Sequence, residues 1–384
     1  MVARHILRCW HKGGSVYTDL PVRLDELLRE GMGGGVFPGA VLVVGTSGSV
    51  LYNNAVGFAS VEPDRVPMKL DTIFDVASLT KPLATSLAVM KLVEIGTVNL
   101  GLTLGDLLPV DVPEDKNTIA LRQLVSHSAG LPDWMPLYKK VEKGKTGRAK
   151  EQIRRLVLQI PLEYIPGTKA LYSDLGYMLL EWVIEAVSGI SLAEFLSRHF
   201  YAPLGLQRTF FQEVDKPLRY PLEEYAATEK CPWRGQVMRG FVHDENAYTM
   251  GGISGHAGLF STAEEVFTLC ATLLAHYHGK RSDLIGPSVV REFFTRQKDP
   301  EGSTWALGWD TPSPRGSAAG RYFSANSVGH LGFTGTSVWM DLDEDIIVVF
   351  LTNRVHPTRD NDKIKGFRPH LHDAVAHCFK RYSA

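Results

Sequence analysis

Residues 74–85 read FDVASLTKPLAT and place a serine and a lysine three positions apart in an otherwise apolar stretch. In a helix, positions i and i+3 share one face, so the Ser78 hydroxyl and the Lys81 amine can meet there. Apolar surroundings lower the pKa of a lysine, which lets its amine serve as the base for a serine nucleophile. An ordinary helix start, with Ser78 or Thr80 as the cap and Lys81 in water, fits the same residues. The rest of the chain must distinguish a reactive pair from a helix start.

The composition is that of a globular protein. The chain has 384 residues, of which 44% are hydrophobic and 22% charged, and its formal net charge is -1. This length suffices for one large domain or two interlocked ones. A net charge near zero gives no general attraction for nucleic acid or an anionic membrane, so neither is expected as a partner. No stretch approaches the roughly 20 apolar residues of a membrane span.

The cysteines and the first residues bear on the compartment. Cys9, Cys231, Cys270 and Cys378 lie far apart with no C-x-x-C pair, which argues against a zinc ribbon or a disulfide scaffold and suits a reducing compartment. The opening MVARHILRCWHKGG is basic but lacks the continuous apolar run of a signal peptide. The sequence predicts a cytoplasmic protein, with export still open if the N-terminus was altered.

Strand patterns occur at both ends of the chain. Residues 39–57 read as two strands joined at a Ser-Gly turn, and residues 336–353 as two β-rich runs around an acidic turn. Between them, apolar residues follow helical spacing, first from Ser78 to about Ile95, where Gly96 is a suitable stop. Terminal strands can complete one sheet while the middle of the chain forms a helical lobe inserted into it.

The sequence therefore predicts an α/β (α+β) fold of two lobes. Residues 1–75 together with 286–384 would form the sheet-containing lobe, and residues 76–285 a mostly helical lobe, with the active site between them.

Two later stretches supply partners for Ser78 and Lys81. LYSDLGYMLL places Tyr172 and Asp174 just before a helix, and VGHLGFTGTSVWM places residues 330–332 at the start of a β-rich run. The order matches the S-x-x-K, S-D-N and K-T-G elements of serine β-lactamases and penicillin-binding proteins. The chain resembles that superfamily, and most of all its class C β-lactamase-like branch, which includes family VIII-type carboxylesterases. LRQLVSHSAGLP, AGLFSTAEEV and WALGWD are similar to further stretches of this branch.

The resemblance implies a β-lactamase/transpeptidase-like fold with a mainly antiparallel sheet flanked by helices. Ser78 would be the acylated nucleophile, and Lys81 its proton acceptor or electrostatic support. Tyr172 would be a second acid/base, either as a phenol or as a phenolate that Lys81 keeps ionised. The backbone N–H groups of Ser78 and Phe333 would form the oxyanion hole. This mechanism needs no metal or organic cofactor.

The substrate-binding candidates are the positions at which the chain departs from the family. Asp174 stands where the branch has Asn, and its charge would help to hold Lys81 protonated. His330, Leu331 and Gly332 stand where β-lactamases have Lys-Thr-Gly. Leucine cannot donate a hydrogen bond, and histidine is neutral at pH 7 unless its pKa is raised. A neutral acyl substrate is therefore easier to accommodate than a carboxylated lactam.

Other polar residues have structural interpretations. His243, Asp244, Glu245 and His256 lie close together in a glycine-rich stretch, but their spacing matches no helix-borne metal motif such as H-E-x-x-H. We expect a tight loop that lines the cleft rather than a metal site. His127 is expected to bond loop backbone, and Asp75 to cap the nucleophile helix. We do not count these four loop residues among the catalytic candidates, nor His127 and Asp75.

Together these patterns predict a serine hydrolase that forms an acyl-enzyme on Ser78. Its partner would be a small-molecule acyl substrate, an ester or an amide, with ester hydrolysis first. A true β-lactamase or a D-alanyl-D-alanine peptidase is the nearer alternative. A catalytically silent ligand-binding protein on the same fold is the alternative from another class, although binding alone needs no nucleophile with two bases.

Overall fold

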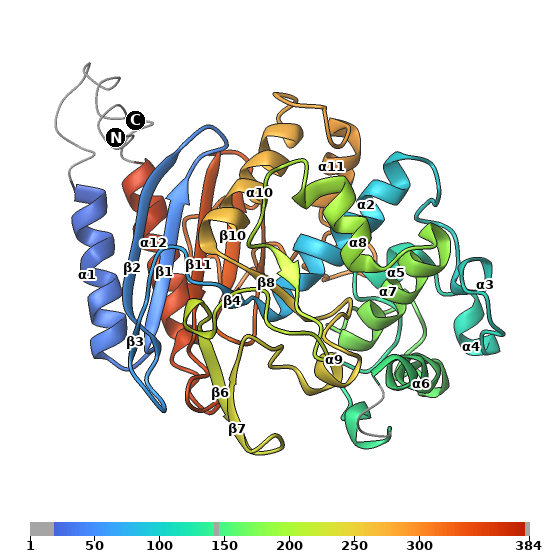
Figure 1. The fold of residues 1–384 in the computed structure, drawn as a ribbon. Coiled ribbons are helices and arrows are strands. Elements are labelled where there is room, and N and C mark those ends of the chain that lie inside the picture. The colour runs from blue at the N-terminus through green and yellow to red at the C-terminus, as the bar shows by residue number, and fades with distance from the viewer. Residues whose placement is uncertain (1–18, 142–145, 381–384) are drawn as a thin grey trace.

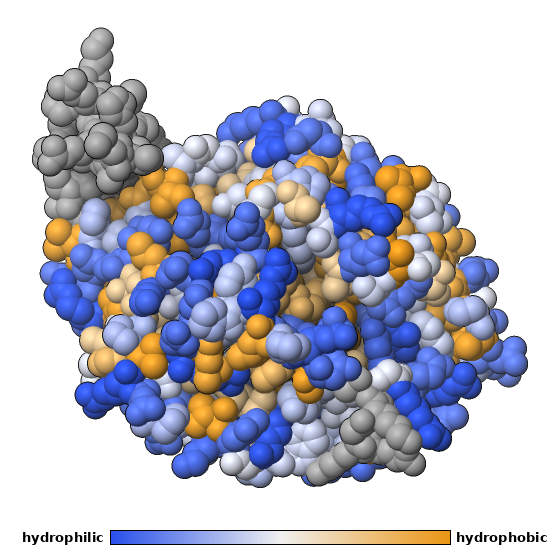
Figure 2. All heavy atoms as spheres, in the orientation of Figure 1, coloured by the Kyte–Doolittle hydropathy of each residue, from blue (hydrophilic) through white to orange (hydrophobic). Residues whose placement is uncertain are grey.

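The computed structural model describes residues 19–141 and 146–380. Cys9 and the segment that was searched for a signal peptide lie outside these residues. In the described part, no helix is long and apolar enough to cross a membrane. Hydrophilic and hydrophobic residues are interspersed over the face drawn in Figure 2.

The main sheet has six antiparallel strands in the order β3-β2-β1-β11-β10-β9. Their bounds are β1 Gly39–Gly45, β2 Val50–Ser60, β3 Val66–Pro67, β9 Ser327–Leu331, β10 Ser337–Asp341 and β11 Ile346–Thr352. The two hairpins predicted near the ends of the chain are confirmed. They meet in the middle of the sheet, where β1 pairs with β11 and places Ala40 opposite Thr352.

Helices cover both faces of this sheet (Figure 1). Side chains alternate along a strand, so neighbours such as Leu42 and Val43 enter different hydrophobic clusters. Leu42 packs in the cluster formed with α1 (Asp19–Gly33) and α12 (Ile364–Lys380). Val43 packs in the larger cluster, which also contains α10 (Ala263–Tyr277) and most of the helical region. Burial on both faces explains why β1 and β11 read as continuous apolar runs.

The helical region is built around α7 (Asp174–Ser188), which is buried from Leu175 to Ile184. Ser173 caps its N-terminus, because the Ser173 Oγ accepts from the Gly176 N–H at 3.2 Å. Gly189 ends the helix at φ +73, a conformation that favours glycine. Tyr172 therefore precedes a firmly anchored helix, which fixes its position beside the sheet.

Further helices and strands complete the described chain. The helices are α2 Ser86–Glu94, α3 Leu104–Leu107, α4 Glu114–Asn117, α5 Leu121–Val125, α6 Thr146–Gln159, α8 Leu192–Leu196, α9 Glu245–Thr249 and α11 Pro287–Phe294. A small sheet contains β4 Phe74–Asp75, β8 Leu259–Ser261 and β5 Phe210–Phe211, and a separate pair contains β6 Ala227–Cys231 and β7 Gln236–Arg239. The division into lobes at residues 76 and 285 stays a prediction.

The helix predicted from Ser78 to Ile95 is present but irregular in its first half. A 3-10 turn (Ala77–Leu79) and a π-helical segment (Lys81–Thr85) precede the regular helix α2. Gly96 follows at φ +72, as the predicted stop. Such local departures from the α-helix often occur at functional sites.

Truncation of a central strand residue should lower stability much more than truncation at the surface. Leu351 of β11 is fully buried, whereas Leu222 is 48% exposed. We expect Leu351→Ala to lower the free energy of unfolding by about 2–5 kcal/mol. Leu222→Ala, the matched control, should stay within about 0.5 kcal/mol of wild type. Denaturant unfolding followed by circular dichroism measures both, and equal losses would contradict this account of the core.

Candidate active site

The segment before Ser78 is held in an unusual backbone conformation. Ala77 has φ +49, which is uncommon for a residue other than glycine. Asp75 stabilises it: one carboxylate oxygen accepts from the Ala77 N–H at 2.9 Å, and the other accepts from the His243 N–H at 2.6 Å. The prediction that Asp75 caps the nucleophile helix is therefore wrong. Its carboxylate holds the turn that precedes the helix, because Val76 occupies the cap position without a side-chain cap bond.

The turn between β9 and β10 is fastened to this same segment. Thr334 donates to the Asp75 carbonyl at 2.8 Å, and Thr336 donates to the Val76 carbonyl at 2.9 Å. Gly332 permits this approach, since a Cβ at that position would lie only 2.6 Å from the Val76 oxygen. The third sequence element is thus brought against the segment that carries Ser78.

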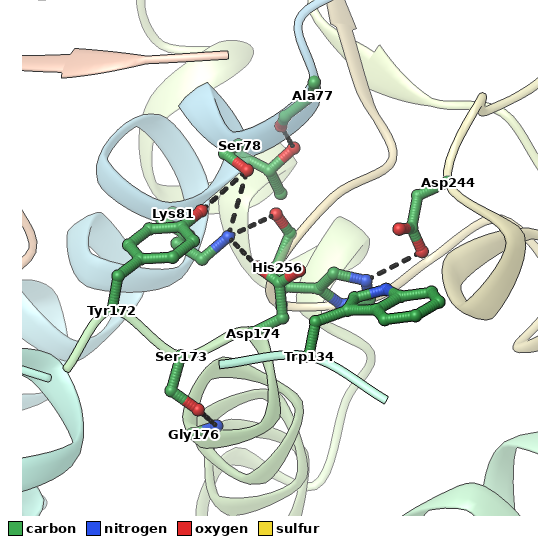
Figure 3. Close-up of polar contacts among 12 residues, drawn as sticks. Ala77, Ser78, Lys81, Trp134, Tyr172, Ser173, Asp174, Gly176, Asp244 and His256 are labelled. Atoms are coloured by element: carbon green, nitrogen blue, oxygen red, sulfur yellow. Dashed lines mark hydrogen bonds and ion pairs between the residues drawn. The ribbon is translucent and has the colours of Figure 1, made fainter. Parts of the chain in front are cut away.

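Ser78, Lys81 and Tyr172 form one hydrogen-bonded group (Figure 3). The Ser78 Oγ accepts from the Lys81 Nζ at 3.2 Å and from the Tyr172 hydroxyl at 2.7 Å. The Lys81 Nζ also lies 4.7 Å from the centre of the Tyr172 ring. The structure therefore brings together the three residues that the sequence nominated for catalysis.

Lys81 is fully buried and held by three oxygen atoms. Besides the Ser78 Oγ, its Nζ donates to the Asp174 carboxylate at 2.7 Å and to the His256 carbonyl at 3.0 Å. Burial lowers the pKa of Lys81, while the charge and hydrogen bond of Asp174 act in the opposite direction. Burial is the larger effect, so the pKa of Lys81 is lowered, and Asp174 limits this decrease in the direction expected of a charged residue in place of Asn.

Tyr172 is protonated in the resting site. Burial, and then the negative charge of Asp174, raise the pKa of Tyr172 well above its usual value. The alternative of a phenolate kept ionised by Lys81 is therefore wrong, because both effects favour the neutral phenol. The Tyr172 ring packs 4.8 Å from the ring of His127, whose Nδ1 accepts from the Ser173 N–H at 3.1 Å. His127 thus bonds loop backbone, as expected.

His330 is a neutral imidazole rather than a cation. Its Nδ1 lies 2.9 Å from the Leu331 carbonyl oxygen, so Nδ1 must carry the proton that is donated to it. Burial, followed by the charge of Lys81, lowers the pKa of His330 to about 3. The lysine of the β-lactamase motif is therefore replaced here by an uncharged imidazole, in agreement with the sequence analysis.

These groups open into a cleft of about 730 Å³. Its wall includes Ser78, Tyr172, Asp174, residues 330–333 and the predicted loop residues His243, Asp244, Glu245 and His256. Two aromatic side chains in the wall are largely exposed, Trp134 at 41% and Phe333 at 47%. No acceptor among the described residues pairs with the Phe333 N–H, which leaves this donor available.

The residues with metal-binding potential next to Lys81 already have other partners. Ligand atoms of Asp174, Asp244 and His256 lie within 4.8 Å of one another. Asp174 binds Lys81, however, and the two His256 ring nitrogens lie 2.9 Å from Asp244 and 2.8 Å from the Ser254 hydroxyl. Figure 3 shows the hydrogen bond between Asp244 and His256. This geometry favours a hydrogen-bonded loop around Lys81.

The sequence analysis missed several residues of the cleft. Arg354, Arg359 and Arg368 line it and come from the segment after β11 and from α12. Trp134 belongs to the loop after the LRQLVSHSAGLP stretch. None of them lies in a motif with fixed spacing, so only the tertiary fold shows their position. The acidic turn before β11, which precedes Arg354 and Arg359, gave no signal of a cleft. The helix that contains Arg368 gave none either.

A family model described as Beta-lactamase matches residues 24–369. The chain belongs to the β-lactamase family. It is a serine hydrolase, and its sheet and helices form the β-lactamase/transpeptidase-like fold that the sequence motifs implied.

Curated relatives cover most of the chain. A Bacillus subtilis protein named N-acetylmuramyl-L-alanine amidase is 32% identical over 363 residues, which are 87% of this chain and 81% of the relative. An Escherichia coli protein named putative D-alanyl-D-alanine carboxypeptidase is 33% identical over 359 residues, 85% of this chain and 81% of the relative. The residues matched by the family model, 24–369, include Ser78, Lys81 and Tyr172.

Solved structures agree on the fold. The hydrolase EstCE1, described as having promiscuous acyltransferase activity, has a TM-score of 0.74 at 23% identity and covers 94% of this chain and 99% of its own. The octameric penicillin-binding protein homologue from Pyrococcus abyssi has a TM-score of 0.67 at 22% identity, covering 86% and 73%. At these identities the similarity concerns the fold alone.

Replacement of Asp174 by asparagine, the residue of the class C β-lactamase-like branch, should change the pH dependence of catalysis. The Asp174 charge raises the pKa of Lys81, so Asp174→Asn removes an effect that keeps the lysine protonated. We expect the acidic limb of kcat/KM to move to lower pH by about 1–3 units. A pH–rate profile with a chromogenic ester measures the shift, with Asp133→Asn as a control in the same cleft. An unchanged acidic limb, or one moved to higher pH, would contradict the assignment of Lys81 as the titrating base.

Proposed function

We propose that the protein hydrolyses small amides and esters through a covalent acyl-enzyme on Ser78. The observation that carries this proposal is the position of the Ser78 Oγ, within hydrogen-bond distance of both Lys81 and Tyr172 at the wall of a large cleft. A serine hydroxyl becomes a useful nucleophile only with such a base at hand.

Acylation begins with loss of the Ser78 proton. Lys81, whose pKa is lowered by burial, accepts this proton in its neutral amine form while the Ser78 Oγ attacks the substrate carbonyl. Tyr172 is a protonated phenol, so it acts as the acid that delivers a proton to the leaving nitrogen or oxygen. Transfer from Lys81 then restores the phenol. In deacylation, water replaces the leaving group and the same proton transfers run in reverse.

The negative charge that develops on the substrate oxygen requires fixed donors. We assign these to the backbone N–H groups of Ser78 and Phe333, because the turn after Gly332 is fastened to the Ser78 segment through Thr334 and Thr336. Such preorganised donors typically contribute about 10²–10³ each in rate. Asp174, His330, Leu331 and Gly332 complete the site as residues that contact Lys81 or line the substrate cleft.

The relatives favour amides over the esters that the sequence analysis placed first. The two curated relatives are named as an amidase and as a putative carboxypeptidase, and both are more than 30% identical over most of the chain. Small peptides or acylated amino acids of the bacterial cell wall are therefore the first substrate class to test. Activated esters acylate the same serine more easily and serve as probes.

A β-lactamase is the second candidate, and the neutral His330 counts against it. In β-lactamases the lysine of the third motif helps to bind the carboxylate of the antibiotic, whereas His330 is uncharged at neutral pH. The arginines in the cleft wall are engaged: Arg359 binds Glu229 and Glu245, and Arg354 binds backbone carbonyls. A lactam carboxylate would therefore not meet the charged lysine that usually binds it.

Labelling with a fluorophosphonate probe tests the nucleophile. We expect the wild-type protein to be labelled and Ser78→Ala to be inert, because the Ser78 hydroxyl bonds both proton-transfer partners, Lys81 and Tyr172. Tyr172→Phe should be labelled about 10²–10⁴ times more slowly, the usual contribution of one acid/base group. Ser128→Ala, which removes another buried serine of this region, is the matched control and should behave as wild type. Persistent labelling of folded Ser78→Ala would reject the assignment.

A substrate panel tests the proposed specificity. We expect hydrolysis of p-nitrophenyl acetate and butyrate, release of an amino acid from small cell-wall peptides or N-acetylmuramyl-L-alanine, and slow or absent turnover of nitrocefin. The ratios of kcat/KM for these compounds are the measurement. Rapid nitrocefin hydrolysis together with inert esters and amides would instead establish a β-lactamase.

A further inference from the structure

Two buried arginines flank the amide that we assign to the oxyanion hole. Arg368 of α12 is 5% exposed, and one of its Nη atoms donates to the Thr336 carbonyl at 2.7 Å and to the Gly332 carbonyl at 3.2 Å. Arg354 is 8% exposed, and its Nε donates to the Phe333 carbonyl at 2.9 Å. Both carbonyl groups of the Gly332-Phe333 dipeptide therefore accept a hydrogen bond from a guanidinium.

Arg368 is a buried cation without a counter-ion among the described residues. It forms no ion pair with any carboxylate in residues 19–141 or 146–380, and its Nε is buried without a partner. Burial, and then the charge of Arg354, lower the pKa of Arg368 to about 9, so the guanidinium is still charged at neutral pH. A buried charge without a counter-ion costs free energy. That cost is understandable if the charge serves the adjacent site.

The Gly332 carbonyl and the Phe333 N–H belong to one planar, resonance-coupled amide. A cationic donor on the carbonyl oxygen withdraws electron density from the amide and makes its N–H a stronger donor, the usual cooperativity of linked hydrogen bonds. The Gly332 N–H also donates to the Thr336 carbonyl at 2.7 Å, the same oxygen that Arg368 binds. Arg368 thus fixes the orientation of the turn as well as its polarity.

We propose that Arg368 is a positioning residue for the oxyanion hole: it orients and polarises the Gly332-Phe333 amide and so strengthens the hydrogen bond from the Phe333 N–H to the substrate oxyanion. This inference rests on the proposed function, since it assumes acyl transfer to Ser78. Arg354 supports the same dipeptide by binding the Phe333 carbonyl, and its guanidinium lies 4.6 Å from the centre of the Phe333 ring.

The test compares Arg368→Met, which removes the charge, with Arg368→Lys, which keeps it. We expect Arg368→Met to lower kcat for p-nitrophenyl butyrate about tenfold with little change in KM, less than the 10²–10³ lost with a whole donor. The inhibition constant of phenylboronic acid, whose serine adduct is tetrahedral, should rise by about the same factor. Arg368→Lys should recover most of both losses. Arg155→Met is the control, because it is the same substitution at an arginine of α6 that is 64% exposed and lies outside the cleft wall.

A spectroscopic readout separates polarisation from a general loss of structure. In an acyl-enzyme with a ¹³C-labelled carbonyl, the stretching frequency reports the strength of the oxyanion-hole hydrogen bonds. This frequency should rise in Arg368→Met and stay near the wild-type value in Arg368→Lys and Arg155→Met. If Arg368→Met does not fold, Arg368→Gln, which keeps a donor without the charge, replaces it with the same expectation.

This inference would be overturned if folded Arg368→Met or Arg368→Gln kept kcat and boronic acid affinity within twofold of wild type and the carbonyl frequency within error of it. Ser78 would still be labelled in that case, and the proposed function would stand. If Ser78 were not acylated in the wild-type protein, the proposed function would fail first, and the role of Arg368 with it.

Discussion

The buried amine of Lys81 is the group around which the site is built. It is fully buried, and it binds the Ser78 hydroxyl, the Asp174 carboxylate and the His256 carbonyl. These partners come from three segments that are far apart in the sequence. An amine in this position costs free energy unless all its donors are satisfied, so the segments must assemble together. One contact network thereby couples the folding of the helical region to the geometry of the nucleophile.

The supporting structure serves this arrangement. Strands from the two ends of the chain form the sheet, which places the turn after β9 against the Ser78 segment. The capped N-terminus of α7 holds Asp174, and Tyr172 lies two residues before it. Asp75 holds Ala77 in its positive φ and joins it to the loop at His243. The site is therefore positioned by hydrogen bonds to backbone groups more than by the side chains of the cleft.

Much of this could be predicted from the sequence. The hairpins follow from β-rich apolar runs and turn residues, and the order of the three motifs nominated Ser78, Lys81 and Tyr172, which the structure brings within hydrogen-bond distance. The phenolate prediction for Tyr172 failed because burial and the charge of Asp174 depend on the tertiary fold. Arg354 and Arg368 could not be predicted as cleft residues for the same reason, because they reach the site from segments without a motif. The role of Asp75 was misjudged because nothing in an Asp-Val-Ala sequence indicates a positive φ at Ala77.

The central claim, that Ser78 is acylated during turnover, is tested most directly by mass spectrometry of the protein quenched during steady-state hydrolysis of p-nitrophenyl butyrate. The account predicts an increase in the intact mass by one butyryl group, located after proteolysis on the peptide that contains Ser78, with no such adduct in Ser78→Ala. Turnover at the wild-type rate without an adduct, or an adduct on another residue, would contradict it.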